Sequence, residues 1–200
     1  MQTSISTIAP LRLTVCGIDE LAGLSEARPT HVLSILDPDR AVPEAFGSYG
    51  EHERLELRFH DNIDPMPGQT MPMPDHVAAL LAFGRDLMAE PPQDAHLLVH
   101  CHAGISRSTA SMTLILAQQR PDLSAGAILA EVLRIREKAW PNLRMLEIGD
   151  GMLGRGGSFP EAAHAIYRHQ LTIRPHLWEF MANLGRGREL ARVPRPAIAS

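Results

Sequence analysis

The sequence predicts an α/β fold, with a mostly parallel central sheet flanked by helices. Short apolar runs of strand length recur along the chain, and longer segments with the apolar period of a helix lie among them. A loop at residues 100–107 joins one such run directly to a helix, as happens at the carboxyl edge of a parallel sheet. The expected strands lie at residues 11–15, 30–36, 55–59 and 97–99.

The first half of the chain alternates strands with short or irregular connections. Residues 11–15 alternate as in a half-buried strand, and residues 30–36 form a more continuous apolar run. A short helix is expected at residues 19–24, whereas residues 39–53 have no clear period. Leu55, Leu57 and Phe59 alternate with charged residues, so a further strand is expected to end near His60 and Asp61. This half therefore supplies most of the sheet.

The second half is predicted to be mainly helical. Pro74 and Asp75 suit the first turn of a helix, because proline is tolerated there and a carboxylate meets the positive end of the helix dipole. Pro91-Pro92 is expected to end this helix. Residues 109–119 are apolar on nearly every side, which is typical of a buried central helix.

Two capping residues and a glycine cluster organise the remaining helices. Ser124 and Asn142 are expected N-caps of two helices, and the glycines near residue 156 are expected to end the second of these helices. Two additional helices are expected at residues 160–173 and 176–184. We assign residues 11–157 to the main domain, residues 158–184 to additional helices packed on or beside it, and residues 185–200, rich in Arg and Pro, to a flexible tail.

Residues 100–108, with the sequence HCHAGISRS, carry the expected chemistry. A loop that leads into a helix directs backbone N–H groups and the positive end of the dipole to one point, which suits a phosphoryl dianion. The same field and Arg107 favour the thiolate of Cys101, which is a nucleophile. Five residues separate Cys101 from Arg107, so the loop can curl and the guanidinium can hold two phosphoryl oxygens. Gly104 tolerates positive φ, and Ser108 could donate a hydrogen bond to the leaving sulfur.

This string, His-Cys-x-Ala-Gly-x-Ser-Arg-Ser between a strand and a helix, resembles the signature of the cysteine-dependent protein tyrosine phosphatases. It is most similar to the compact dual-specificity branch, over about residues 13–153. The resemblance implies a protein tyrosine phosphatase-like fold and hydrolysis of phosphomonoesters through a phosphocysteine, without metal or cofactor. It also implies catalytic roles for Cys101, Arg107 and Ser108 and a structural role for His100. The implied substrate-binding residues are His102, Ala103, Gly104, Ile105, Ser106 and Arg107.

The general acid that such a reaction needs is expected at Asp61. In the family this acid is an aspartate on a loop before the nucleophile, and both Asp61 and Asp64 are suitably placed. Asp61 is preferred because it directly follows the expected strand. Asp64-Pro65 could instead start a turn, and residues 66–74 form a longer loop than the compact pattern needs, so the assignment between the two stays open.

The expected substrate is a mono-phosphorylated group, most simply phosphotyrosine on a protein, with phosphoserine or phosphothreonine also admissible. Relatives that act on inositides or RNA triphosphates tend to have Lys or Arg among the five loop residues, and residues 102–106 have neither. Phosphatases of small phosphorylated metabolites and catalytically silent phosphate- or phosphopeptide-binding modules remain alternatives. A persulfide sulfurtransferase also holds a cysteine in a cradle loop, but it usually lacks the Ser106-Arg107-Ser108 exit.

Composition bears on the partners, the location and the source that the sequence predicts. The net charge of −4 gives no electrostatic reason to expect nucleic acid or an anionic membrane as a partner. No apolar run reaches the roughly 20 residues that span a bilayer, and a cytoplasmic location is expected.

Cys16 and Cys101 are expected to stay reduced, and the His100-Cys101-His102 triplet lacks the second ligand pair of a zinc site. Asp94 and Asp150 are expected to be solvated. Arginine exceeds lysine, of which Lys138 is the sole example, which suggests a GC-rich bacterial source.

Overall fold

The computed structural model describes residues 4–5, 8–89 and 94–195, and a five-stranded sheet organises them. The strand order is β1-β2-β5-β3-β4, and neighbouring strands are parallel except for the antiparallel pair β1 and β2. The predicted mostly parallel sheet is thus confirmed. The strands are β1 (Ser4–Ile5), β2 (Arg12–Cys16), β3 (His31–Leu36), β4 (Glu53–Arg58) and β5 (His96–His100).

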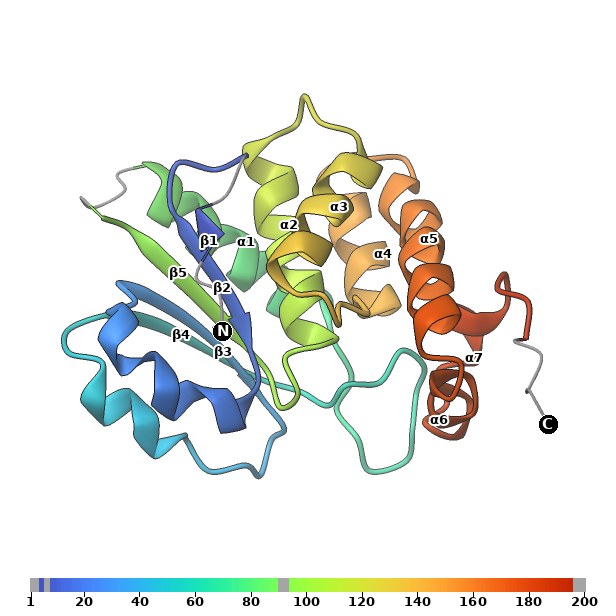
Figure 1. Cartoon of the computed structure of the whole chain (residues 1–200), viewed down its shortest axis with the longest axis horizontal. Helices are drawn as coiled ribbons and strands as arrows, with labels where there is room; N and C mark the ends of the chain where they lie inside the picture. The colour runs from blue at the N-terminus through green and yellow to red at the C-terminus, as the bar shows by residue number, and fades with distance from the viewer. Residues whose placement is uncertain (1–3, 6–7, 90–93, 196–200) are drawn as a thin grey trace.

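Helices cover both faces of this sheet (Figure 1). On one face the α-helices enclose the larger apolar core, in which α2 contacts α1, α3 and α4. The other face is covered by two 3-10 helices, η1 (Ile18–Ala27) and η2 (Glu44–Ser48). The α-helices are α1 (Pro74–Ala89), α2 (Arg107–Gln119), α3 (Ala125–Ile135), α4 (Leu143–Met152), α5 (Ser158–Ile173), α6 (Leu177–Asn183) and α7 (Gly187–Leu190).

The central position of β5 determines where a ligand can approach. β5 lies between β2 and β3, so the loop at its carboxyl end opens in the middle of the sheet edge, where open α/β sheets bind ligands. The helix that follows, α2, is buried from Arg107 to Ala117, as its apolar sequence predicts. β5 and the first turns of α2 are therefore both buried, and the loop between them opens at the edge of the sheet.

Both predicted N-caps are confirmed. The Ser124 side chain accepts a hydrogen bond from the Ala127 N–H at 3.2 Å, and the Asn142 side chain accepts one from the Met145 N–H at 3.0 Å. Each cap satisfies one of the backbone donors that the first helical turn leaves without an intrahelical partner. These contacts begin α3 and α4 at the expected residues.

Several local expectations need correction. Residues 39–53 contain η2 rather than being wholly irregular, and the short helix expected at residues 19–24 extends from Ile18 to Ala27 as a 3-10 helix. The strand expected to be half-buried is buried at four successive residues of β2, because both faces of that strand are covered. The predicted helix stop at Pro91-Pro92 lies outside the described residues.

Asp150 is buried instead of solvated. Its carboxylate accepts hydrogen bonds from the Gly157 N–H at 2.5 Å and from the Phe159 N–H at 2.9 Å. An aspartate at a helix N-terminus satisfies free backbone donors and meets the positive end of the dipole. Asp150 therefore connects the end of α4 to the start of α5, whereas Asp94 is exposed as expected.

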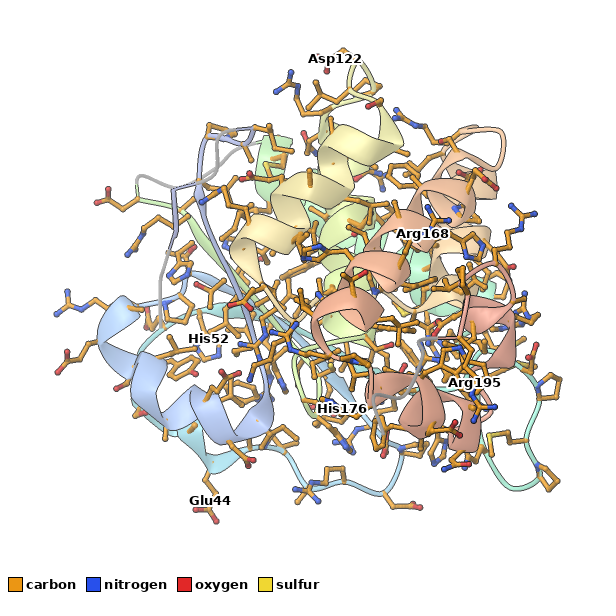
Figure 2. All side chains as sticks on the ribbon, turned by 45° about the vertical axis from the view of Figure 1, so that its right-hand side comes forward. Glu44, His52, Asp122, Arg168, His176 and Arg195 are labelled. Atoms are coloured by element: carbon orange, nitrogen blue, oxygen red, sulfur yellow. The ribbon has the colours of Figure 1, made fainter. Side chains whose placement is uncertain are left out.

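The segment expected to be a flexible tail is partly built into the fold. Residues 187–190 form α7, and the side chains of Arg186 and Glu189 are buried. The expectation of a flexible tail is therefore wrong for these residues, while residues 196–200 lie outside the described part of the chain. Charged side chains of both signs, such as Glu44, Asp122 and Arg195, point outward (Figure 2).

No helix within the described residues combines the length and the apolar character needed to cross a membrane.

Candidate active site

The loop between β5 and α2 separates its backbone acceptors from its backbone donors. Five successive carbonyl oxygens accept hydrogen bonds from other parts of the chain, whereas the N–H groups of the same residues, 102–106, donate to no acceptor among the described residues. Such unpaired N–H groups in one loop form a site for an anion. The donors are Ile18 N to His102 O (2.9 Å), Arg136 Nη2 to Ala103 O (3.0 Å), Arg136 Nε to Gly104 O (2.9 Å), Trp140 N to Ile105 O (2.9 Å) and Ala110 N to Ser106 O (3.0 Å).

Gly104 allows this loop to lie directly against the end of β2. Its φ of +66° favours glycine, and a Cβ at this position would lie 2.3 Å from the backbone carbonyl carbon of Cys16. Behind the loop, Arg136 also pairs with Glu20 at 2.8 Å. The close backbone approach and the Arg136 contacts together fix the shape of the loop.

Cys101 lies at the base of this loop and lines a cavity of about 420 Å³. Its Sγ atom is 3.2 Å from the Ser108 hydroxyl oxygen, so the expected pairing of these two side chains is present. Arg107, Asp61 and His102 line the same cavity. The structure therefore brings the sequence-predicted nucleophile, arginine and acid to one place.

The Arg107 guanidinium has protein partners on one nitrogen and none on another. Its Nη1 donates to Asp37 Oδ1 at 2.7 Å and to the Phe59 carbonyl oxygen at 2.5 Å. Its Nε is buried and has no hydrogen-bond partner among the described residues. A buried donor without a partner costs free energy, which an anionic ligand in the cavity would recover. Arg107 is thus oriented to supply a charged donor beside Cys101.

The two histidines next to Cys101 differ in role. His100 is fully buried, and its Nε2 lies 2.7 Å from Ser34 Oγ, which fits the structural role that the resemblance implies. Burial lowers the pKa of His100 to about 4, so the ring is neutral at physiological pH. His102 lines the cavity, and its Nδ1 lies 3.5 Å from Asp37 Oδ2. Burial and the Arg107 charge lower the pKa of His102.

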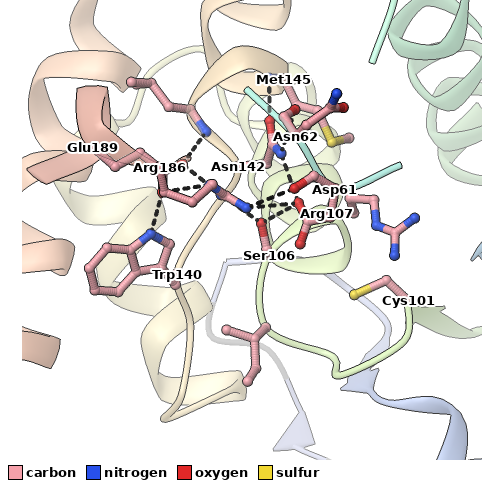
Figure 3. A network of polar contacts seen from close by, with 12 residues as sticks. Asp61, Asn62, Cys101, Ser106, Arg107, Trp140, Asn142, Met145, Arg186 and Glu189 are labelled. Atoms are coloured by element: carbon pink, nitrogen blue, oxygen red, sulfur yellow. Dashed lines mark hydrogen bonds and ion pairs between the residues drawn. The ribbon is translucent and has the colours of Figure 1, made fainter. Parts of the chain in front are cut away.

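Asp61 follows β4 and is held by a network of donors (Figure 3). Its Oδ1 accepts hydrogen bonds from Ser106 Oγ (2.7 Å), Asn142 Nδ2 (2.8 Å) and Arg186 Nη1 (3.1 Å). Its Oδ2 has no hydrogen-bond partner among the described residues, and 31% of the side chain is exposed. The carboxyl group therefore keeps one oxygen free beside the cavity.

The charges around Asp61 determine its protonation. Burial alone raises the pKa of a carboxyl group, but the Arg186 and Arg107 charges and the hydrogen bonds from Asn142 and Ser106 outweigh it. The pKa of Asp61 consequently lies below its ordinary value. Asp61 is a carboxylate at neutral pH and holds a proton only in more acidic solution.

Comparison of the sequence with protein-family models and with curated proteins found no match. Solved structures that are similar include human DUSP28, with a TM-score of 0.55 and 17% identity over 76% of this chain and 100% of that one. Tk-PTP in its active form has a TM-score of 0.52 and 21% identity over 78% of this chain and 99% of that one. The human tyrosine phosphatase-like serine/threonine/tyrosine-interacting protein has a TM-score of 0.56 and 18% identity over 77% of this chain and 98% of that one.

The chain has the fold of these tyrosine and dual-specificity phosphatases. The identities are low, so the likeness establishes the architecture and leaves activity to the site itself. The expected bacterial origin receives no support from these neighbours. In this fold the loop after β5 lies at the carboxyl edge of the parallel sheet, where open α/β sheets bind ligands.

Asp64 lies elsewhere in this phosphatase-like fold. Its carboxylate pairs with Arg188 at 2.9 Å, about half of its side chain is exposed, and it does not line the cavity. Among the described residues, no group of three or more His, Cys, Asp or Glu side chains is placed to hold a metal ion. Of the two carboxylates that the sequence leaves open, only Asp61 borders the same cavity as Cys101.

Sequence reasoning missed several residues of the site. Asp37 orients Arg107, and Arg186 contacts Asp61, although 70 and 125 positions respectively separate the two partners along the chain. Phe180 and Leu184 also line the cavity. Their spacing of four residues indicates a shared helix face but does not indicate which surface that face meets.

Proposed function

We propose that the protein is a phosphatase that hydrolyses phosphomonoesters, with protein phosphotyrosine as the main substrate, through a phosphocysteine intermediate. The observation that carries the proposal is a set of donors without protein acceptors next to Cys101. Among the described residues, the N–H groups of residues 102–106 and the buried Nε of Arg107 have no acceptor, and four of these five loop residues line one cavity with Cys101 and Arg107. A phosphoryl group has the charge and the several acceptor oxygens that such a site requires.

In the proposed first step, the Cys101 thiolate attacks phosphorus in line with the ester oxygen. The S–P bond forms as the P–O bond breaks, and the loop N–H groups and Arg107 stabilise the charge on the three equatorial oxygens. The leaving oxygen receives the proton of Asp61. The free Oδ2 of Asp61 is the oxygen available to carry that proton, since Oδ1 already accepts three hydrogen bonds.

In the second step, water attacks the phosphocysteine. Asp61, now a carboxylate, takes a proton from the water as the new P–O bond forms and the S–P bond breaks. The Ser108 hydroxyl, 3.2 Å from Sγ, donates a hydrogen bond to the departing thiolate. Inorganic phosphate leaves and the thiolate is restored.

The Asp61→Asn substitution should lower turnover about a hundredfold for an aryl phosphate with a poor leaving group, because asparagine cannot donate the proton. The Asp64→Asn protein should remain within a few-fold of wild type, since Asp64 faces Arg188 outside the cavity. Phosphate release under steady-state conditions measures both. A larger loss in Asp64→Asn would transfer the acid role to Asp64.

The rim of the cavity supports an aromatic leaving group. Phe180 and Leu184 of the α6 region and Met66 of the loop after β4 line it, although each is at least 40% exposed. Large apolar side chains that stay exposed together around one cavity are typical of a binding surface. Tyrosine presents an apolar ring next to its phosphate, whereas serine presents a single methylene, so this rim favours phosphotyrosine.

The Phe180→Ala substitution should raise KM for a phosphotyrosine peptide about fivefold, with little change in kcat, because ring contact is lost in both the ground state and the transition state. The KM for a phosphoserine peptide should change less. Met152→Ala, which removes a similarly exposed apolar side chain from α4 outside the cavity, is the matched control. An equal rise in KM for both peptides would remove the argument for phosphotyrosine.

The second candidate function is a phosphate- or phosphopeptide-binding module. The observation that favours it is the ionised state of Asp61, whose lowered pKa reduces the supply of protonated acid at neutral pH. The test is hydrolysis of an aryl phosphate with a chelator present, over acidic and neutral pH. Binding of phosphate or vanadate without turnover at any pH would select the binding module over the phosphatase.

A further inference from the structure

Arg186 is a buried arginine in a segment that the phosphatase signature does not include. It directly precedes α7, and only 3% of its side chain is exposed. A charged group that is taken out of water must be paired and hydrogen-bonded to be tolerated. The partners of Arg186 therefore indicate why this segment folds back onto the domain.

All three nitrogens of the Arg186 guanidinium are used (Figure 3). Nη1 donates to the Asp61 backbone oxygen and to its Oδ1, both at 3.1 Å. Nη2 donates to Ser106 Oγ at 3.0 Å and to Glu189 Oε1 at 2.7 Å, and Nε donates to Glu189 Oε2 at 3.0 Å. One side chain thus connects the aspartate after β4 with the last residue of the loop before α2.

Glu189 anchors this arginine to the core. It is fully buried, and its two oxygens also accept hydrogen bonds from Trp140 Nε1 at 2.5 Å and from the Leu143 N–H at 3.0 Å. The carboxylate therefore fixes the guanidinium from behind, and the opposite edge of the guanidinium faces Asp61 and Ser106. A flexible lysine could not make this bidentate arrangement.

We propose that Arg186 is a positioning residue for the general acid: it holds the Asp61 carboxyl group and the Ser106 hydroxyl so that the free Oδ2 of Asp61 is directed to the leaving oxygen. The inference rests on the proposed phosphatase function and extends it to a residue outside the predicted domain of residues 11–157. Arg186 acts through Asp61, and it takes no part in bond making itself.

The pH profile gives a readout that a purely structural role would not move. The charged and titratable groups near Asp61 are Arg107 at the start of α2, His102 in the loop, Tyr167 on α5, and Arg186 with Glu189 around α7. Removing the Arg186 charge lets Asp61 keep its proton to a higher pH. Because the reaction needs protonated Asp61, the basic limb of the pH profile of kcat/KM should move to higher pH.

The main variant is Arg186→Met combined with Glu189→Gln, which removes both buried charges together. For an aryl phosphate with a poor leaving group, its basic limb should lie about one pH unit above that of wild type. The same pair of changes in the Asp61→Asn background should cause little additional loss, since residues that act as one unit are not additive. An unmoved limb, or an equal loss with and without Asp61, overturns the proposal.

Two single variants complete the test. Arg186→Lys keeps the charge but cannot hold Asp61, Ser106 and Glu189 at once, so we expect a basic limb near that of wild type and a several-fold lower kcat. If the double variant does not fold, this variant decides, and an unchanged kcat overturns the proposal. Arg188→Ala is the matched control, because Arg188 lies in the first turn of α7, two residues after Arg186, and pairs with Asp64 and Glu147 instead of Asp61.

The controls also distinguish a failure of the Arg186 proposal from a failure of the proposed phosphatase function. A wild-type protein without turnover overturns the phosphatase function itself. A wild-type protein that turns over, with a basic limb that does not respond to Arg186, overturns only the role of Arg186. Thermal unfolding of each variant shows whether a lost activity reflects a lost fold.

Discussion

Replacement of Cys101 by serine is expected to abolish phosphate release from an aryl phosphate, with a loss on the order of a thousandfold or more. The serine hydroxyl stays protonated at neutral pH and cannot replace the thiolate as a nucleophile. The loop N–H groups and Arg107 remain, so the variant should still bind phosphate or vanadate. Phosphate release and calorimetric binding measure the two properties separately.

The matched control is Cys16→Ala. Cys16 is fully buried, it lies outside the cavity, and burial raises the pKa of its thiol above the ordinary range. The Cys16→Ala protein should therefore keep its activity, and iodoacetate should label Cys101 in preference to Cys16. Retention of activity in Cys101→Ser would refute a phosphocysteine intermediate.

The second large effect is expected for Arg107→Lys, which should lower kcat/KM about a thousandfold. Nη1 of Arg107 is committed to Asp37 and to the Phe59 carbonyl oxygen, and a separate nitrogen, Nε, remains for the ligand. A lysine carries its three N–H donors on one tetrahedral nitrogen, so it cannot reproduce the planar fork that contacts the protein partners through one nitrogen and the phosphoryl group through another. Steady-state kinetics over the acidic pH range measures the loss.

Arg120→Lys is the control for the loss of an arginine from the same helix. Arg120 caps the C-terminal end of α2, at the opposite end of the helix from the loop, and pairs with Asp122 at the surface. Surface ion pairs contribute little to stability, so this variant should match wild type. A similar activity of Arg107→Lys and Arg120→Lys would show that the guanidinium fork is dispensable.

The residues of the candidate site that the sequence predicts lie close together along the chain. Cys101, Gly104, Arg107 and Ser108 belong to one loop, and the strand and helix on either side are recognisable from the periods of their apolar residues. The same local logic identifies Ser124 and Asn142 as caps. Local signals therefore suffice for the loop that forms one half of the candidate site.

The other half of the candidate site, around Asp61 and Arg186, depends on contacts between residues far apart in the sequence, which no local sequence pattern predicts. Arg186 stands among other arginines and prolines, a composition that is also typical of a solvated tail, and only the packing of α7 brings it to Asp61. Asp150 is comparable, since its burial depends on how α5 approaches the end of α4. Long-range pairing of charges is determined by tertiary packing, which single-sequence patterns do not contain.

The distance along the chain between Asp61 and Arg186 has a consequence for biosynthesis. Translation proceeds from the N-terminus, so the sheet, the loop and Cys101 are all made before Arg186 is added. A nascent chain that has folded through α4 already contains the loop at residues 102–106 and the proposed nucleophile but lacks the Arg186 guanidinium that contacts Asp61. We therefore expect newly made chains to acquire phosphate affinity first and full catalytic power only near the end of synthesis.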